Sequence, residues 1–320
     1  MKKEAVSAAL FGFALCGFLP ASAQAEIAIA ESMEWVLANS DRVIVGQVVK
    51  VDKVTGPDIK EYEAATVAIS KTLKGAQADR ETFLIQYYNG KYAQEWMDEK
   101  TPILFCLVKN DGKRTPFPVA KFQWVLRDDG HYNDAVLLGK SKQTWTGSTP
   151  VLASHCEVLT EKKAILKFVE QTLKAAVQGR APRSHTLDVP SETAVFKELW
   201  SGSVVELIVP IDENLEELGR YWCKSASYNK RTEGAKVLRY FKNEKNIEIL
   251  KSLLGDPITV IVSQEEPGKD GRMELVYRKN LYFVRQAAFD ALHELGVNVP
   301  RPVLEELLEG RDAPALKKDH

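Results

Sequence analysis

The chain has 320 residues, and this length favours two domains over one. Hydrophobic residues make up 45% of the chain and charged residues 27%, which is the ordinary composition of a globular protein. The formal net charge of −1 provides no general attraction for nucleic acid or for anionic lipid, so no nucleic-acid partner is expected.

Residues 1–25 have the pattern of a secretory signal peptide. Lys2 and Lys3 precede an apolar run, Ala5 to Leu19, that is too short to span a bilayer comfortably. Cleavage is expected after Ala23-Gln24-Ala25 or after Ala21-Ser22-Ala23, and an uncleaved anchor is the alternative interpretation. No later segment is long and apolar enough to cross a membrane. We expect a secreted or periplasmic protein without a membrane span in the mature chain.

Residues 26–179 are predicted to form a small β-domain with a helix at its end. After a short helix around Trp35 and Val36, strands are predicted at 42–54, 62–75, 82–88, 102–112 and 122–133, with turn signals between them. This spacing is typical of a small barrel or sandwich. The closing helix begins at Thr160 and ends at Gly179, and its apolar face is expected to pack on the barrel rather than to form a groove for a partner.

Four segments of this β-domain, ANSDRVIVGQVVKV, YEAATVAISKTLKG, TFLIQYY and PILFCLVK, resemble the secreted β-module related to the netrin-like, OB-type barrel. The resemblance covers residues 31 to about 110 and implies a small β-barrel. Its best-known members, the tissue inhibitors of metalloproteinases, chelate the protease zinc through an N-terminal cysteine. Here the expected mature N-terminus is Glu26, so the resemblance implies the fold and not that activity.

The cysteines indicate a disulfide or buried thiols. Cys106 and Cys156 both lie in the first half of the chain and are the natural pair in an oxidising compartment. The alternative is that these two and Cys223 are buried thiols. The chain has no Cys-x-x-Cys, and its five histidines are scattered, so neither a metal site nor a cofactor is expected.

Residues 180–192 are polar and contain two prolines, which is typical of a linker. Beyond it, 193–310 is predicted to be mainly helical. A strand-like run, SVVELIVPI, precedes apolar helical periodicity at 212–222, 232–241, 246–254 and 284–295. A last helix is predicted from Pro302, with Val303, Leu304, Leu307 and Leu308 on its buried face. The final residues, 311–320, are expected to be a disordered tail.

The sequence Leu-Leu-Gly-Asp-Pro ending at Pro257, and Val284-Arg285-Gln286-Ala287-Ala288, are similar to the HEAT repeat family. In that family Asp-Pro ends one helix and Val-Arg-x-x-Ala opens the next, so the resemblance implies a short α-solenoid that binds partners. Here an insertion separates the two halves. Its extended runs at Ile258–Val262 and Met273–Tyr277 flank turn residues and predict a hairpin. Such insertions often bind partners, and the alternative is a loop of tolerated length.

Signatures of catalysis are missing. The run Leu138–Lys142 has Asp134 where a phosphate loop needs glycine, and neither Gly-x-Ser-x-Gly nor His-Glu-x-x-His occurs. Ser154-His155-Cys156-Glu157 are neighbours in sequence, which does not make a triad. The stretch Asp128–Asp134, which contains His131, lacks calcium-loop spacing.

The predicted architecture is therefore α+β, with an OB- or netrin-like barrel followed by a short HEAT-like solenoid that carries an inserted β-hairpin. The predicted function is non-enzymatic binding or scaffolding with a protein partner. The candidate binding residues lie around the insertion: Tyr277, Arg278, Lys279, Tyr282 and Arg285. Two alternatives stay open, a protease inhibitor that acts through the β-domain and an enzyme with a site between the domains.

Overall fold

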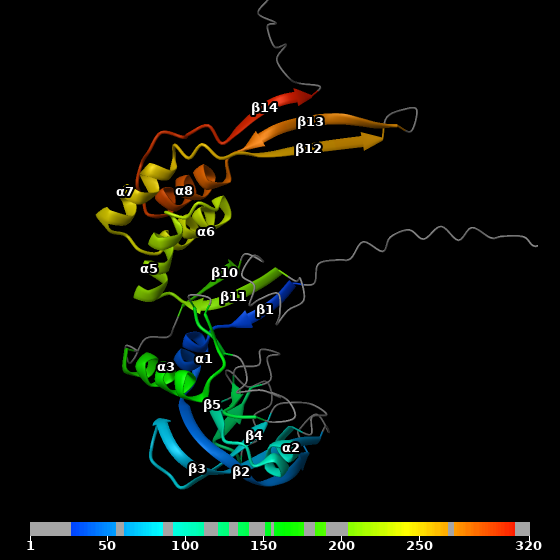
Figure 1. Ribbon diagram of the computed structural model, residues 1–320, viewed down its shortest axis with the longest axis vertical. Helices are drawn as coiled ribbons and strands as arrows, with labels where there is room; N and C mark the ends of the chain where they lie inside the picture. Colours follow the sequence, from blue (N-terminus) through cyan, green and yellow to red (C-terminus); the bar gives the residue numbers. More distant parts are fainter. Residues whose placement is uncertain are drawn as a thin grey trace, which may run out of the picture.

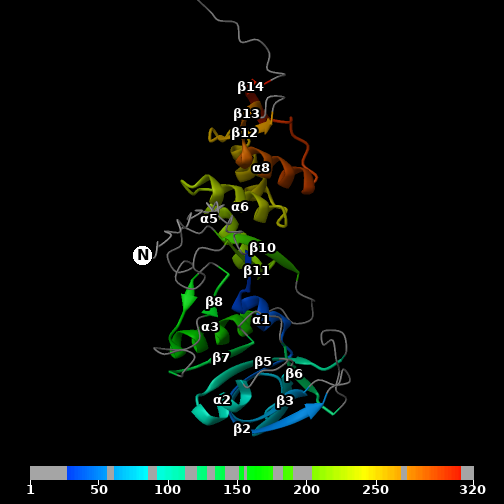
Figure 2. The same ribbon diagram turned by 90° about the vertical axis from the view of Figure 1, so that its right-hand side faces the viewer.

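The computed structural model describes residues 27–55, 61–85, 92–111, 121–127, 134–140, 151–154, 157–175, 183–189, 204–267 and 272–310. The fold is mixed α+β. Figures 1 and 2 show an elongated molecule with a β-barrel at one end, a small sheet in the middle, and helices that carry a second sheet at the other end. Among the described residues, no helix has both the length and the apolar character needed to cross a bilayer.

The barrel contains five strands: β2 (Arg42–Thr55), β3 (Glu61–Lys74), β4 (Arg80–Ile85), β5 (Ile103–Lys109) and β6 (Trp124–Leu126). Their spatial order is β2-β3-β4-β6-β5, and pairing of β2 with β5 closes the barrel. Only the β4–β6 pair in this barrel is parallel. The short strand β7 (Ala135–Leu137) pairs with the start of β5. Each of the five predicted ranges overlaps one of these strands, and residues 86–88 and 128–133 at the ends of two of the ranges lie outside the described residues.

Strand β5 is apolar on both faces because both faces are buried. Ile103, Phe105 and Leu107 point into the barrel, whereas Leu104 and Cys106 pack outward under helices. Those helices are α1 (Met33–Asn39) and α3 (Lys162–Ala175), whose buried side chains join one core with the outer face of the barrel. The prediction that the closing helix packs on the barrel is therefore confirmed. A two-stranded ribbon, β8 (Val151–Leu152) and β9 (Val158–Leu159), lies before α3 in the chain.

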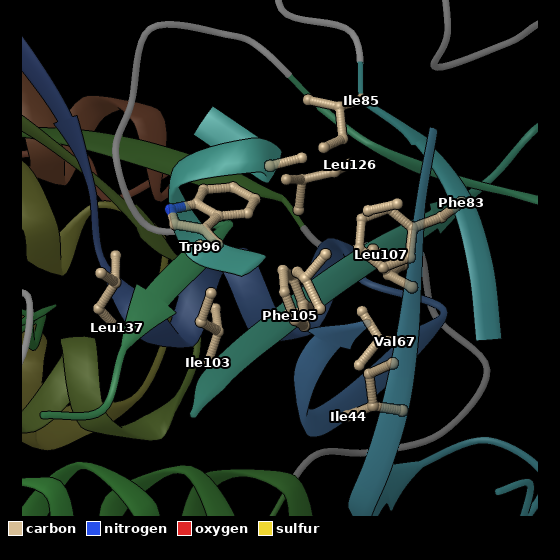
Figure 3. Packing of buried hydrophobic residues seen from close by; sticks show 13 residues of the cluster. Ile44, Val67, Phe83, Ile85, Trp96, Ile103, Phe105, Leu107, Leu126 and Leu137 are labelled. Atoms are coloured by element: carbon tan, nitrogen blue, oxygen red, sulfur yellow. The ribbon is translucent and has the colours of Figure 1, made fainter. Parts of the chain in front are cut away.

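Helix α2 (Tyr92–Glu99) was not predicted, and it contributes to the core of the barrel. Its Trp96 ring lies 5.8 Å from the ring of Phe105, which in turn lies 5.0 Å from that of Phe83 (Figure 3). All three rings are buried. Ala93 and Trp96 of α2 thus belong to the same hydrophobic cluster as the inward-facing strand residues.

A three-stranded sheet connects the two halves. Strand β11 (Val204–Pro210), the strand-like run of the sequence, pairs in parallel with β1 (Ile27–Glu31) and antiparallel with β10 (Ser184–Val189). The range 180–192 that was assigned to a linker therefore contains a paired strand. The physical reason is alternation: His185 and Leu187 are buried, while Thr186 and Asp188 face solvent and make the segment polar on average.

Four helices follow: α5 (Glu213–Trp222), α6 (Tyr228–Leu238), α7 (Glu244–Leu253) and α8 (Phe283–Glu294), as their periodicity predicts. Helix α6 packs against both α5 and α8, and α7 packs against α8. The approach of α5 and α6 is close because Gly219 has no side chain. A Cβ at that position would lie 2.7 Å from Cγ1 of Val237.

The inserted hairpin is confirmed as β12 (Val260–Pro267) and β13 (Met273–Leu281), which pair antiparallel. The helix predicted from Pro302 is wrong: residues Glu305–Gly310 form strand β14, which pairs with the other side of β13. No helix of the described residues packs against this segment, whereas β13 has an edge with which it can pair. Tertiary pairing therefore overrides the local helical periodicity. We call strands β12, β13 and β14 the arm. Figure 1 shows the arm beside α8, at the end of the molecule far from the barrel, with its strands running across the long axis.

Candidate functional site

The arm has no hydrophobic core of its own. None of its residues is buried, and none belongs to the hydrophobic clusters of the described chain. A small sheet normally needs an apolar face packed against something else to be stable. The arm is therefore a surface whose faces and edges are open to a partner.

Exposed apolar side chains are concentrated on and beside the arm. Of eight large hydrophobic side chains exposed in the described residues, two, Val49 and Tyr221, lie elsewhere. The other six lie on the arm or directly beside it: Ile258, Ile261, Met273, Phe283, Val303 and Leu307. Scattered exposed apolar residues are normal in soluble proteins, but a concentration in one region marks an interaction surface.

The strand register shows where these side chains gather. Val260 pairs with Leu281, and Leu281 pairs with Glu305. Ile258 lies two residues before β12, Phe283 two residues after β13, and Val303 two residues before β14, so all three lie where the arm joins the helices. Their exposed fractions are 42%, 41% and 59%, respectively. Sequence analysis missed these residues, although the β-branched run from Ile258 to Val262 was a usable signal.

The structure brings the five predicted binding residues to one place but gives most of them other partners. Tyr277, Arg278 and Lys279 lie on β13, the central strand of the arm. Arg278 pairs with Glu309 at 3.3 Å and Lys279 with Glu305 at 2.8 Å, so both cations hold β14 against β13. The hydrogen bond between Lys279 and Glu305 raises the pKa of the lysine and lowers the pKa of the glutamate.

Tyr282 and Arg285 fasten the arm to the helices. The guanidinium of Arg285 lies 3.8 Å from the Tyr282 ring centroid, a cation–π contact. Its Nε donates to the carbonyl oxygen of Asp256 at 2.7 Å, and its Nη1 donates to that of Val303 at 3.2 Å. The Asp256-Pro257 and Val284-Arg285 halves of the repeat signature thus meet in space although the insertion separates them in sequence.

Asp256 is the centre of this junction. Its buried carboxylate receives two hydrogen bonds from Arg231 on α6, at 2.7 and 3.0 Å. It also accepts a hydrogen bond from the backbone N–H of Ile258 at 3.1 Å, two residues before β12. One carboxylate therefore links α6 to the start of the arm, and its neighbouring carbonyl links α8 to the same point. The arm projects from a fixed base.

The arm is strongly acidic. Its three strands contain only two basic residues, Arg278 and Lys279, but six glutamates: Glu265, Glu266, Glu274, Glu305, Glu306 and Glu309. The whole chain is almost neutral, so this charge is a local feature. Surfaces of one sign favour partners of the opposite sign and speed their encounter.

A second polar cluster lies between β10 and α6. His185 Nδ1 is 3.1 Å from the hydroxyl of Tyr240, and Arg239 donates to the same hydroxyl at 2.6 Å. Burial, followed by the nearby charges of Arg239 and Lys236, lowers the pKa of His185 to about 4. A neutral imidazole packed edge-on against an aromatic ring is a common structural arrangement. His131 and His155, the other histidines considered, lie outside the described residues.

Charged groups also connect β1 and α1 to the barrel domain. Arg127 binds Asp134 through two hydrogen bonds of 3.0 Å and contacts Glu31 at 3.5 Å. The hydroxyl of Ser154, a candidate nucleophile by residue type, donates to the carboxylate of Glu34 at 2.7 Å. Glu34 also accepts from the backbone N–H of Ser154, so these contacts hold the chain before α3 against α1.

Cys106 and Cys223 are buried. Burial raises the pKa of the Cys106 thiol, and it raises the pKa of Cys223 to about 12. Both are free thiols in the structure. Cys156 lies outside the described residues, so its pairing with Cys106 stays a prediction. Within the ranges that the structure describes, no group of three or more His, Cys, Asp or Glu residues could hold a metal ion.

No protein-family model, curated protein or solved structure matches this chain. The HEAT-like and netrin-like assignments of the sequence therefore stay predictions, and the functional argument rests on the geometry of the arm.

Proposed function

We propose that this protein is a non-enzymatic binding protein, secreted or periplasmic, that docks a partner protein on the arm. The observation that carries the proposal is that six of the eight large hydrophobic side chains exposed in the described residues lie on or beside a sheet with no buried residue. A partner that covered this sheet would remove apolar surface from water, which is the main driving force of protein association.

The rest of the molecule would act as a scaffold that holds the arm. We propose that the first half is an OB-type barrel, because it is a small closed barrel of five strands in which β5 lies between β2 and β6. We propose that the helices form a short HEAT-like unit, because the Asp256 and Arg285 elements of the repeat signature are in contact. The hydrogen bonds of Asp256 and Arg285 at the base of the arm would limit its movement and reduce the entropy lost on binding.

The test uses matched apolar substitutions. One variant carries Ile261→Ser and Met273→Ser on the arm, and the control carries Val49→Ser and Tyr221→Ser, which are exposed to a similar extent elsewhere. Each mature protein is immobilised and exposed to a bacterial envelope extract, and retained proteins are identified and then rebound as pure components. We expect at least one partner to bind the wild type and the control and to be lost from the arm variant.

The proposal is overturned if the arm variant, with an unchanged circular dichroism spectrum, retains the same partners as the control. A third protein, in which a short Gly-Ser linker replaces residues 260–281, extends the test to the whole hairpin. It keeps Asp256 and Arg285, so the base of the arm is preserved. Retention of every partner by this protein would refute docking on the arm. Neither protease inhibition nor an interdomain active site is favoured by a specific observation in the described residues.

A further inference from the structure

We infer that the outer edge of β12 accepts an extended basic segment of the partner as a fourth strand of the arm. This inference rests on the proposed function and specifies the mode of binding and the chemistry of the partner. Among the residues that the structure describes, the order β12-β13-β14 leaves one side of β12 unpaired. The backbone N–H and C=O groups on that side are a template for another strand.

Over its first five residues, 260–264, strand β12 lacks the features that protect edge strands in most proteins. Such edges are short or carry lysine, proline within the strand, or inward-pointing charges. Strand β12 has eight residues and begins with Val260, Ile261, Val262 and Ser263, none of them charged. Its proline, Pro267, is the last residue, and Ile261 is 62% exposed. This edge is therefore open to pairing along most of its length.

The other edge of the arm is less suited to pairing. Strand β14 has six residues, three of which are glutamates, and it carries the extra residue, Leu308, where its register with β13 shifts. The register of β12 with β13 also shifts, after Gln264, but there the extra residue, Val276, lies on β13. Two of the glutamates, Glu305 and Glu309, form ion pairs with β13. Charge, short length and irregular register all disfavour addition of a strand. Of the two edges, β12 is the one that fits an incoming segment.

The side chains of β12 define what the incoming segment should contain. Glu265 and Glu266 are exposed near the outer end of the strand, whereas the end next to the helices is β-branched and lies close to Ile258 and Phe283. Cross-strand pairs of opposite charge and pairs of β-branched residues both stabilise a sheet. A complementary segment has lysine or arginine opposite the two glutamates and β-branched residues along the remainder.

The test uses synthetic peptides as probes. The probe Lys-Lys-Thr-Val-Thr-Val-Thr-Val is titrated to millimolar concentration into isotope-labelled protein, and backbone amide shifts are followed by NMR. Controls are the same peptide with two glutamates in place of the lysines, and a form that is N-methylated at alternate residues and so loses donors to the edge. We expect shifts along β12 with the lysine probe, binding about tenfold weaker with the glutamate peptide, and none with the N-methylated form.

Substitutions test which edge of the arm binds the probe and which charges contribute to that binding. Ile261→Lys should abolish binding of the lysine probe, whereas Leu307→Lys on β14 should leave it unchanged. Glu265→Gln with Glu266→Gln should weaken binding about tenfold, whereas the matched pair Glu217→Gln with Glu248→Gln, on exposed helix faces, should not. If no probe binds at millimolar concentration, or if Leu307→Lys is the variant that abolishes binding, the inference is overturned.

Failure of this inference differs from failure of the proposed function. If the partner captured by the wild type is lost from the Ile261→Ser/Met273→Ser variant but still binds Ile261→Lys, the arm is the docking surface and strand addition is not the mode. If sedimentation shows that the protein self-associates and that Ile261→Lys abolishes this, the edge is occupied by a second copy of the chain, and a basic partner segment is refuted.

Discussion

Replacement of Asp256 by alanine should be among the most destabilising single changes in the helical half. The change removes both hydrogen bonds from Arg231 and the acceptor of the Ile258 N–H. The side chains of Asp256 and Arg231 are only 6% and 12% exposed, so water cannot replace the lost contacts. Loss of one partner of a buried ion pair typically costs about 3–5 kcal/mol.

The structure places this cost at the lower end of that range. Arg231 also donates to the carbonyl oxygens of Ser225 and Ala226, each at 2.8 Å, so its charge keeps two acceptors after the change. We therefore expect the free energy of unfolding to fall by about 3 kcal/mol. That is a large fraction of the ~5–15 kcal/mol by which most domains are stable.

The measurement is urea denaturation, with Trp222 fluorescence reporting on the helices and Trp96 fluorescence on the barrel in single-tryptophan versions of the protein. Only the transition reported by Trp222 should move to lower urea. The control is Asp290→Ala, which removes an exposed hydrogen bond from Gln286 on α8 and should cost less than about 0.5 kcal/mol. A loss below about 1 kcal/mol for Asp256→Ala, or equal shifts for the two variants, would refute the assignment of Asp256 as the junction of the arm.

Two further predictions concern the helical half and its sheet. Gly219→Ala should destabilise the protein by about 1–3 kcal/mol, because the added Cβ would lie 2.7 Å from Cγ1 of Val237. The control is Gly255→Ala, which should be neutral because an added Cβ there has no neighbouring atom within 4 Å. Equal denaturation midpoints for the two variants would contradict this packing. The folded state lowers the pKa of His185 from 6.5 to about 4, so the unfolded chain takes up its proton first as the pH falls. The contribution of the neutral His185 to stability is therefore fully present above pH 6.5 and falls by about 3 kcal/mol toward pH 4. Unfolding curves at several pH values should show this pH-dependent loss in the wild type and in a variant of the exposed His293, but not in His185→Gln. An unchanged pH profile in His185→Gln would contradict the prediction.

The sequence by itself determined most of the local structure. Alternation in β2 and β3, the fully apolar β5, and helical periodicity from α5 to α8 are local signals with one good solution. Helix α2 was predictable in principle, because Ala93, Trp96 and Met97 have helical spacing. The hairpin was also visible as two extended runs around turn residues. Of the five residues expected to bind, Tyr277, Arg278 and Lys279 lie on its strand β13, and Tyr282 and Arg285 lie at the start of α8.

The tertiary structure decided what pairs with what. Strand β10 is polar on average because only alternate residues are buried, and β14 has helical periodicity but pairs with the edge of β13. The ion partners of Arg278 and Lys279 lie 31 and 26 residues away, so no local pattern could indicate that these cations are already engaged. Exposure is likewise a property of the assembled molecule. Ile261 and Val303 would be core candidates in sequence. They become candidates for contact with a partner because, within the described residues, no element packs over their side chains, which are 62% and 59% exposed.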